Sequence, residues 1–179
     1  MFLGVDKLLE LVKTQNLVTD LSERELTNPE GTGFDLRVAE FFKISGHGFL
    51  GIDERETCKT ELIVKYDPKK PSKITIKPDD FYLIKTIEKV NVPENLVGII
   101  KPRTTMQRMG LFIRESQIAP GYEGELTVAL KNLGDATVDI ELGARVIHVM
   151  FAKVDGKTNL YRGQWKGGRV TTEKKEKQV

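Results

Sequence analysis

Short segments in which apolar and polar residues alternate constrain the fold of this chain more than any other feature. The clearest of them cover residues 34–38, 125–131 and 137–142. Successive side chains of a β-strand point to opposite faces, so this alternation is typical of strands with one buried face. Turn signals at close spacing, such as Leu133-Gly134-Asp135, separate these segments. The pattern predicts an all-β fold, a distorted jelly-roll-like barrel.

Only the N-terminal segment has a helical pattern. Apolar residues at helical spacing in residues 5–13, Leu8 and Leu9 among them, predict a short N-terminal helix. We expect it to cover one end of the sheet; the alternative is that it packs on a neighbouring subunit. The polar segment 19–32 that follows contains a turn at residues 28–31.

The length of 179 residues suits one domain, which would bury roughly 70% of its unfolded surface. We expect a single domain over residues 1–170. Residues 171–179 are polar and rich in lysine, and such a composition predicts a disordered tail.

Composition excludes several classes of partner. The net charge is +2, so no overall charge favours nucleic acid or an anionic membrane, and any phosphate site must be a local cluster. No apolar run approaches the ~18 residues of a membrane span. The single Cys58 permits no internal disulfide, which fits a reducing cytoplasm, and two histidines do not suffice for a zinc site.

A local cluster of phosphate-binding residue types lies in residues 101–132, KPRTTMQRMGLFIRESQIAPGYEGELTVALKN. Arg103, Thr104, Thr105 and Arg108 supply guanidinium forks and hydroxyl donors within six positions. A polyanion such as a triphosphate is bound by this combination of groups. The sequence therefore predicts a triphosphate site at this turn.

Five ordered motifs between about residues 30 and 170 resemble those of dUTPases and dCTP deaminases. PRTTMQRMGL is similar to the PRSSLxRLGL run of dCTP deaminases and the PRSGLA run of trimeric dUTPases. IAPGYEGELTVALKN resembles their IDPGWxGxLTLELxN, and GTGFDLRV their AGYDL or SxDLRL. GARVIHVMF resembles GxRIAQLxF, and YRGQWKGGRV resembles YxGxYxGxxG.

The resemblance implies a deoxypyrimidine nucleoside triphosphate as ligand, Mg²⁺ held mainly through its phosphates, and a homotrimer whose sites are shared between subunits. It implies that the glycine-rich segment near Trp165 closes over the triphosphate. The nucleotide-binding residues it suggests, besides the four of the turn, are Gln117, Ile118, Ala119, Tyr122, Tyr161, Gln164, Trp165, Gly168 and Arg169. Asp35 and Arg37 are accessory candidates, because their motif lies beside the nucleotide in the family; the alternative is a surface ion pair worth under about 1 kcal/mol.

Two departures from the family pattern affect catalysis. Ala119 stands where dUTPases carry the aspartate that handles the attacking water, and Ala129 where dCTP deaminases carry a glutamate. A methyl group neither accepts a proton nor orients water, so both usual general bases are missing. The period-two pattern places Ala129 on the polar face of its strand, where a catalytic acid would project. Candidate replacements nearby are Glu115, Gln117, Glu123 and Glu125.

Three functions are compatible with these residues. The first is a dUTP diphosphatase-like enzyme, producing dUMP and pyrophosphate, with a displaced base. The second is a dCTP deaminase with a rearranged site. The third is a nucleotide-binding protein of the same fold with weak or no catalysis.

Overall fold

The computed structural model describes residues 1–178, and Val179, the last residue of the predicted tail, lies outside the described residues. The helices are α1 (Val5–Gln15), α2 (Glu23–Thr27) and α3 (Thr104–Arg108). The strands are β1 (Val18–Thr19), β2 (Gly33–Ser45), β3 (Phe49–Leu50), β4 (Glu54–Glu56), β5 (Lys59–Lys65), β6 (Lys73–Ile76), β7 (Phe81–Asn91), β8 (Leu96–Pro102), β9 (Leu111–Arg114), β10 (Glu123–Asn132), β11 (Val138–Glu141), β12 (Arg145–Lys153) and β13 (Glu176–Lys177).

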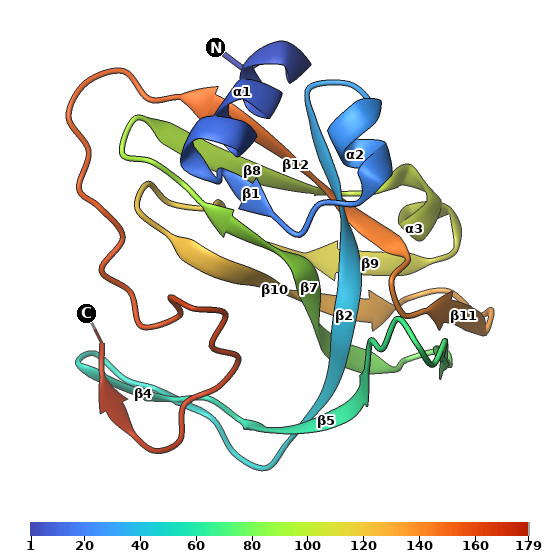
Figure 1. The fold of residues 1–179 in the computed structure, drawn as a ribbon. Helices are drawn as coiled ribbons and strands as arrows, with labels where there is room; N and C mark the ends of the chain where they lie inside the picture. The colour runs from blue at the N-terminus through green and yellow to red at the C-terminus, as the bar shows by residue number, and fades with distance from the viewer. Residues whose placement is uncertain (179) are drawn as a thin grey trace.

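One large antiparallel sheet forms most of the barrel (Figure 1). Its strand order is β8-β12-β2-β7-β10-β9, with β1 added to β7 and β5 added to β2. Two small sheets, β11-β6 and β13-β4-β3, complete it. The predicted all-β, barrel-like fold is confirmed. No helix in the described range is long and apolar enough to cross a bilayer.

Strand β2 connects the two ends of the molecule. Its first residues pair with β12, and its later residues pair with β7 and then β5. A bulge in β2 lies between Val38 and Glu40, opposite β7, and a bulge in β12 lies between Arg145 and Ile147, opposite β2. Such bulges bend a strand and increase its twist, so β2 can belong to both walls of the barrel. Figure 1 shows it running most of the height of the molecule.

The alternation predicted for residues 125–131 is confirmed in β10. Leu126, Val128 and Leu130 are buried, whereas Thr127 and Ala129 on the other face are partly exposed. The inward residues join a core whose largest fully buried side chains include Phe34, Phe41 and Phe151. These are apolar side chains from strands far apart in sequence, and their burial is the main driving force for closing the barrel.

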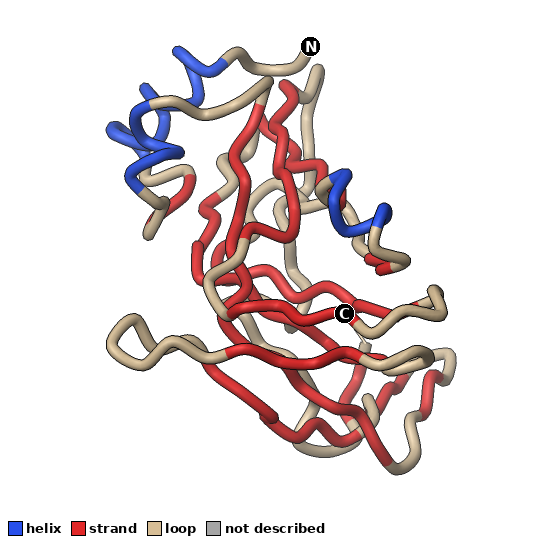
Figure 2. The backbone as a smooth tube through the Cα atoms, turned by 90° about the vertical axis from the view of Figure 1, so that its right-hand side faces the viewer, coloured by secondary structure: helices blue, strands red, loops and turns tan. Residues whose placement is uncertain are grey.

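Both N-terminal helices lie at one end of the barrel, and the β3–β4 hairpin lies at the other (Figures 1 and 2). The predicted N-terminal helix is confirmed as α1, whose Leu8 is fully buried. The short helix α2 falls in the polar segment for which only a turn was predicted. Its Glu25 is fully buried, and this polar burial has no signal in the sequence pattern.

The prediction of a disordered tail is wrong for residues 171–178. Thr172 is buried, and the backbone N–H of Thr57 donates to its hydroxyl at 3.0 Å. Further on, β13 pairs with β4, with Glu176 opposite Arg55. Polar side chains thus hold the tail by specific hydrogen bonds, although its composition lacks the apolar residues that usually order a segment.

Gly124 in β10 permits close approach of this C-terminal segment. Its φ is 133°, and a Cβ placed there would lie 2.5 Å from the backbone nitrogen of Gly168. The neighbouring Gly167 N–H donates to the carbonyl oxygen of Glu123 at 2.7 Å. Any side chain at position 124 would push the two backbones apart.

We expect Gly124→Ala to destabilise the fold more than Gly156→Ala, measured by urea unfolding. Gly156 also has a positive φ, 91°, but a Cβ there would have no neighbour within 4 Å. Both changes place an L side chain in a strained backbone conformation, at a cost of roughly 1–3 kcal/mol. Only Gly124→Ala also displaces the C-terminal segment. Equal losses of stability would show that this contact contributes nothing.

Candidate functional site

The turn predicted to bind phosphate borders a cavity of about 410 Å³, here called the turn cavity. It lies where β8 runs into α3, and residues of β2 and β12 complete it. Hydroxyls, cations and carboxylates line this open space together with apolar atoms. Its lining residues are Glu30, Gly31, Asp35, Lys101, Pro102, Arg103, Thr104, Thr105, His148 and Met150.

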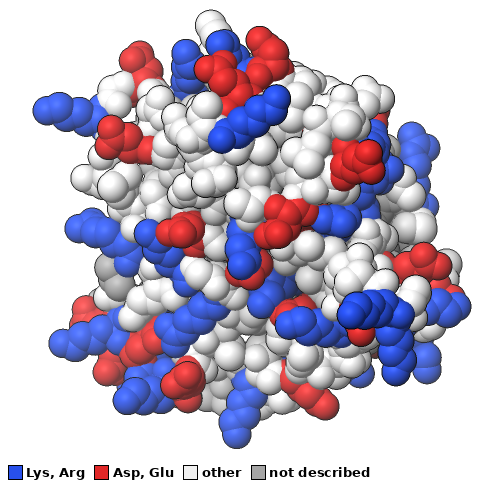
Figure 3. Space-filling model, in the orientation of Figure 1, with Lys and Arg blue, Asp and Glu red and all other residues white. Residues whose placement is uncertain are grey.

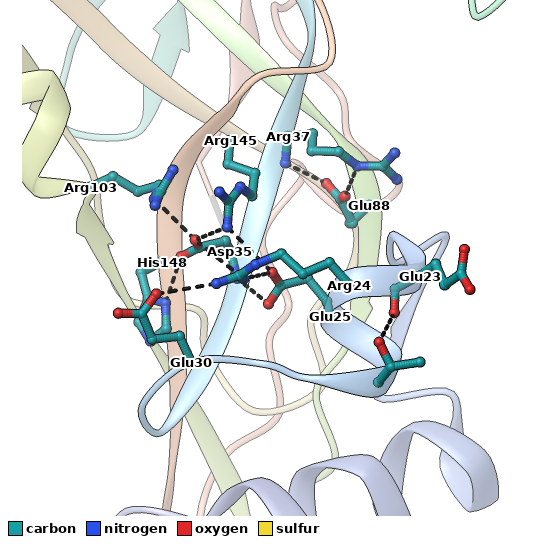
Figure 4. A network of polar contacts seen from close by, with 11 residues as sticks. Glu23, Arg24, Glu25, Glu30, Asp35, Arg37, Glu88, Arg103, Arg145 and His148 are labelled. Carbon is teal, nitrogen blue, oxygen red and sulfur yellow. Dashed lines mark hydrogen bonds and ion pairs between the residues drawn. The ribbon is translucent and has the colours of Figure 1, made fainter.

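Asp35 is the buried charge of the turn cavity (Figure 4). Its Oδ1 accepts a hydrogen bond from His148 Nδ1 at 2.9 Å. Its Oδ2 pairs with Arg103 Nε at 3.0 Å and with Arg145 Nη1 at 3.1 Å. This carboxylate therefore holds Arg103, the first arginine of the turn that is predicted to bind phosphate. An accessory role for Asp35 at a nucleotide stays a prediction.

The pKa of Asp35 lies below its ordinary value despite its burial. Burial alone raises this pKa, but the hydrogen bond from His148 and the charges of Arg103 and Arg145 outweigh that effect. Asp35 is thus ionised near neutral pH and acts only as an acceptor. Consequently, the proton in its bond to His148 sits on Nδ1.

Glu25 of α2 is hydrogen-bonded to the backbone of Asp35. Its Oε2 accepts the backbone N–H of Asp35 at 3.0 Å, and its Oε1 contacts Arg24. Arg24 also pairs with Glu30 at 3.2 Å, which ties the loop before β2 to the same group of charges. The helix missed in the sequence therefore contributes two of the charged residues around the turn cavity.

Arg37 lies outside the turn cavity. Its Nε pairs with the fully buried Glu88 at 2.6 Å, and its Nη2 donates to the carbonyl oxygen of Asp20 at 2.5 Å. Burial raises the pKa of Glu88, and its bonds to Arg37 offset part of this effect. Arg37 and Asp35 therefore do not pair with each other, contrary to the surface ion pair considered above.

A second cavity, of about 290 Å³, lies under the C-terminal segment and is here called the tail-covered cavity. Its floor comes from β8, β10 and the segment after β9, and residues 161–170 form its cover. Its lining residues are Thr57, Leu83, Ile100, Ser116, Gln117, Ile118, Ala119, Tyr122, Leu126, Thr127, Tyr161, Trp165, Arg169 and Val170. Seven of the nucleotide-binding residues suggested by the resemblance are in this set.

Aromatic side chains shape one side of this cavity. The rings of Tyr122 and Tyr161 meet edge to face, with centroids 5.3 Å apart. The Tyr122 hydroxyl donates to the carbonyl oxygen of Glu125 at 2.7 Å, and burial raises its pKa to about 12. Tyr122 is therefore a protonated, fixed wall of the cavity near neutral pH.

The polar groups of the lining are neutral except for Arg169. Ser116, Gln117 and Thr127 carry two hydroxyls and an amide. Thr127 Oγ1 is buried and has no hydrogen-bond partner among the described residues. Leaving a buried hydroxyl unpaired costs about 1–3 kcal/mol, and an occupant of the cavity that offers a hydrogen-bond donor or acceptor at this point would remove that cost.

No carboxylate lines the tail-covered cavity within the described chain. Ala119 is part of the lining, and Ala129 lies on the partly exposed face of β10, opposite Leu83 and Arg114. Glu123 and Glu125 line a different groove, next to Lys89. Glu115 lies between β9 and the lining segment and is not part of the lining. A replacement base among these residues stays a prediction.

Ion pairs fasten the cover of the cavity, and two of their residues, Arg55 and Glu176, were missed in the sequence analysis. The Glu176 carboxylate pairs with Arg55 at 3.1 Å and Arg169 at 2.8 Å, and the Trp165 ring lies beside both guanidinium groups. The hydrogen bond from Arg169, together with Arg55, lowers the pKa of Glu176. Arg55 also donates to Gln164 at 2.6 Å. Gln164 and Gly168, both expected at the nucleotide, lie outside the lining.

The two cavities share no lining residue. Consecutive residues of β8, Ile100 and Lys101, line one cavity each, and consecutive side chains of a strand point to opposite faces. Arg108 lines neither cavity; it is exposed on α3, four residues after Thr104, and so on the same face of that helix. Within one chain, the turn that is predicted to bind phosphate and the tail-covered cavity therefore lie on opposite faces of β8.

Charge on the molecular surface is mixed. Figure 3 shows acidic and basic side chains interspersed over one face of the molecule. A broad basic field of the kind that attracts nucleic acid is not visible on that face. At the turn cavity, Lys101 and Arg103 lie beside Glu30 and Asp35, and a local phosphate site at this turn stays a prediction.

The fold is that of the dUTPase and dCTP deaminase superfamily. A family model described as "dCTP deaminase-like" matches residues 2–154. The chain therefore belongs to the dCTP deaminase-like family.

Curated relatives align over nearly the whole chain. A protein named dCTP deaminase from Pyrobaculum islandicum is 29% identical over 178 residues, covering 96% of this chain and 95% of its own. Another from Pyrobaculum arsenaticum is 30% identical over 175 residues, with the same coverage of 96% and 95%.

A solved dCTP deaminase from Agrobacterium tumefaciens has the same fold, with a TM-score of 0.65 and 13% identity. The match covers 84% of this chain and 46% of the solved chain. This chain thus spans about half the length of that structure.

Asp35→Asn should lower the free energy of unfolding at pH 7 by about 1.5–3 kcal/mol, the range for hydrogen bonds to a charged group. Because the folded pKa of Asp35 is lowered, its contribution is complete above the unfolded pKa of about 3.9 and is lost as pH falls through the folded value. Urea unfolding at pH 7 and pH 3 should therefore give a smaller difference at pH 3. Asp139→Asn, at an exposed pair with Lys73, should cost less. A difference independent of pH would contradict this account.

Proposed function

We propose that the protein binds a deoxypyrimidine nucleoside triphosphate. We propose further that dCTP is its substrate and that the reaction is the deamination for which its relatives are named. The observation that carries this proposal is the tail-covered cavity, which combines aromatic walls with neutral groups able to bind the edge of a base. The relatives named dCTP deaminase support dCTP ahead of dUTP, the substrate that the sequence alone favoured. The cytoplasm, suggested by the lone Cys58, is the location we propose.

The lining of the tail-covered cavity suits both cytosine and uracil. The hydroxyls of Ser116 and Thr127 donate and accept, and the amide of Gln117 does both. Cytosine presents a 4-amino donor and an N3 acceptor, whereas uracil presents a 4-carbonyl acceptor and an N3–H donor. An ionised carboxylate, which only accepts, would favour the amino group of cytosine. Without one, the lining gives little discrimination, and we expect both dCTP and dUTP to bind.

The triphosphate would lie against the turn that carries Arg103, Thr104 and Thr105. The guanidinium group and hydroxyls of this turn donate to phosphate oxygens, and Lys101 adds a further cation. Mg²⁺ would be held by the phosphates, because this ion keeps several waters and needs few protein ligands. Both oxygens of Asp35, the buried carboxylate here, are already engaged by His148, Arg103 and Arg145.

We propose that neighbouring copies of the chain complete each site, in a homotrimer. The phosphate-binding turn and the tail-covered cavity share no lining residue, so a single nucleotide would need the turn of one chain and the cavity of the next. Cyclic symmetry repeats such a shared site once per subunit. Light scattering should give about three times the chain mass of 20.2 kDa, and a monomer at micromolar concentration would exclude this arrangement.

Catalysis is the part of the proposal that Ala119 and Ala129 limit. Deamination of dCTP adds water at C4 and releases ammonia, and it needs a group that moves protons at the base. Hydrolysis of dUTP to dUMP and pyrophosphate needs a group that orients water at the phosphate. Since no carboxylate of residues 1–178 lines the cavity, we expect slow turnover with nucleotide binding intact.

Replacing Arg108 with Ala should weaken binding of dCTP by about 1.5–3 kcal/mol, the range for a hydrogen bond to a charged group. Arg108 shares the exposed face of α3 with Thr104, where it would meet a nucleotide held by a neighbouring chain. Calorimetry with dCTP and dUTP measures the change. Lys13→Ala, at the end of α1, is the control for loss of one positive charge. Equal affinities of wild type and Arg108→Ala would remove this residue from the site.

Ala129→Glu should raise the release of ammonia from dCTP by about 10²–10⁴-fold, the usual contribution of a positioned general base, while affinity changes little. Ala119→Asp should do the same for pyrophosphate release from dUTP. Both products are followed separately with purified protein. If wild type already turns over at an ordinary enzyme rate, Glu115→Gln, Glu123→Gln and Glu125→Gln identify the replacement base. Robust wild-type activity that survives all three changes would overturn the assignment of this segment.

A further inference from the structure

His148 lies beside the turn that is proposed to bind phosphate. The proposed reaction assigns no role to this titratable side chain. It lines the turn cavity together with Arg103, Thr104 and Thr105, and its side chain is 22% exposed. Figure 4 shows it next to Asp35, on the side of the network that Arg103 occupies. It comes from β12, directly opposite Asp35 on β2 and Lys101 on β8.

Asp35 leaves one nitrogen of this imidazole available. Because the ionised carboxylate accepts the Nδ1–H at 2.9 Å, Nε2 is the remaining polar atom of the ring. Nε2 has no hydrogen-bond partner among the described residues. It lies in the space left by Gly33, since a Cβ there would be 2.7 Å from it. The backbone thus makes room for this nitrogen at the edge of the cavity.

The charges around His148 are of both signs. Those on the elements packed against it are the cations Arg24, Lys101, Arg103 and Arg145 and the anions Glu25, Glu30 and Asp35. A triphosphate entering the turn cavity would add several negative charges to this set. Added negative charge favours the protonated form of a nearby imidazole, which is the side chain whose charge ordinarily changes between pH 5 and 8.

We propose that His148 is a proton-linked phosphate ligand, which takes up a proton on Nε2 when the triphosphate binds and donates that N–H to a phosphate oxygen. The proton comes from solvent, and Asp35 keeps Nδ1–H in place throughout. This inference rests on the proposed function, because it requires the triphosphate to lie in the turn cavity. By linkage, the affinity for triphosphate should increase as pH falls from 8 to 6.

Calorimetry in buffers of different ionisation enthalpy measures the protons taken up on binding. We expect wild type to take up more protons than His148→Gln on binding dCTP or inorganic tripolyphosphate at pH 7.5. Ligand protonation is common to both proteins and cancels in the difference. His148→Gln should reduce affinity about tenfold at pH 6 and much less at pH 8, because glutamine offers a hydrogen bond without the charge.

The control is His47→Gln, the only other histidine of the chain, in an exposed loop outside the turn cavity. It should match wild type in proton uptake and in affinity at both pH values. Thermal unfolding of each variant without ligand separates loss of binding from loss of fold.

Two outcomes distinguish this inference from the function on which it rests. Equal proton uptake by wild type and His148→Gln, with dCTP bound by both, would overturn the inference and leave the proposed function standing. Failure of wild type to bind dCTP at any pH would overturn the proposed function itself.

Discussion

The burial of one negative charge, the carboxylate of Asp35, determines how the elements around the turn cavity meet. A buried carboxylate is tolerated only where cations and hydrogen-bond donors surround it, because desolvation of an unpaired ion costs several kcal/mol. These partners come from β12, from the end of β8 and from α2, and their ion pairs with Asp35 bring the three elements together. The ion pair with Asp35, almost seventy positions earlier in the chain, therefore fixes the position of Arg103 and with it the geometry of the turn.

The alternation of apolar and polar residues was sufficient to predict strands such as β2 and β10, but it did not predict the burial of Asp35. Asp35 alternates with Phe34 and Leu36, so the pattern placed it on a polar, solvated face. In the structure that face of β2 is covered, and Asp35 is 4% exposed. The contacts responsible join residues 110 and 113 positions apart, and no local pattern carries information at that range. Burial of Glu25 in α2 was missed for a similar reason, because its partners include the backbone N–H of Asp35 and the guanidinium group of Arg145, which lie outside the helix.

The candidate site was predicted in parts. The turn at Arg103–Thr105 and the segment from Gln117 to Tyr122 were identified from residue chemistry and resemblance, and each does line a cavity. Their separation into two cavities could not be read from the sequence, because it depends on the pleat of β8. The C-terminal segment was expected to be mobile at its end, yet it is fastened through Arg55 and Glu176, 121 positions apart. Charged residues that a sequence pattern assigns to the solvated surface can thus form the ion pairs that hold a segment over a cavity.

Thr127 gives the tail-covered cavity a preference that does not depend on catalysis. Its buried hydroxyl has no partner among the described residues, so an occupant that offers a donor or acceptor at this point recovers free energy that a hydrocarbon of the same shape cannot. Sites built around such a group reject close isosteres strongly, whereas purely apolar pockets separate them weakly. If the proposed nucleotide places its base here, analogues that match it in volume but lack the hydrogen-bonding edge would be poor competitors, and an inhibitor of this cavity would have to keep that edge.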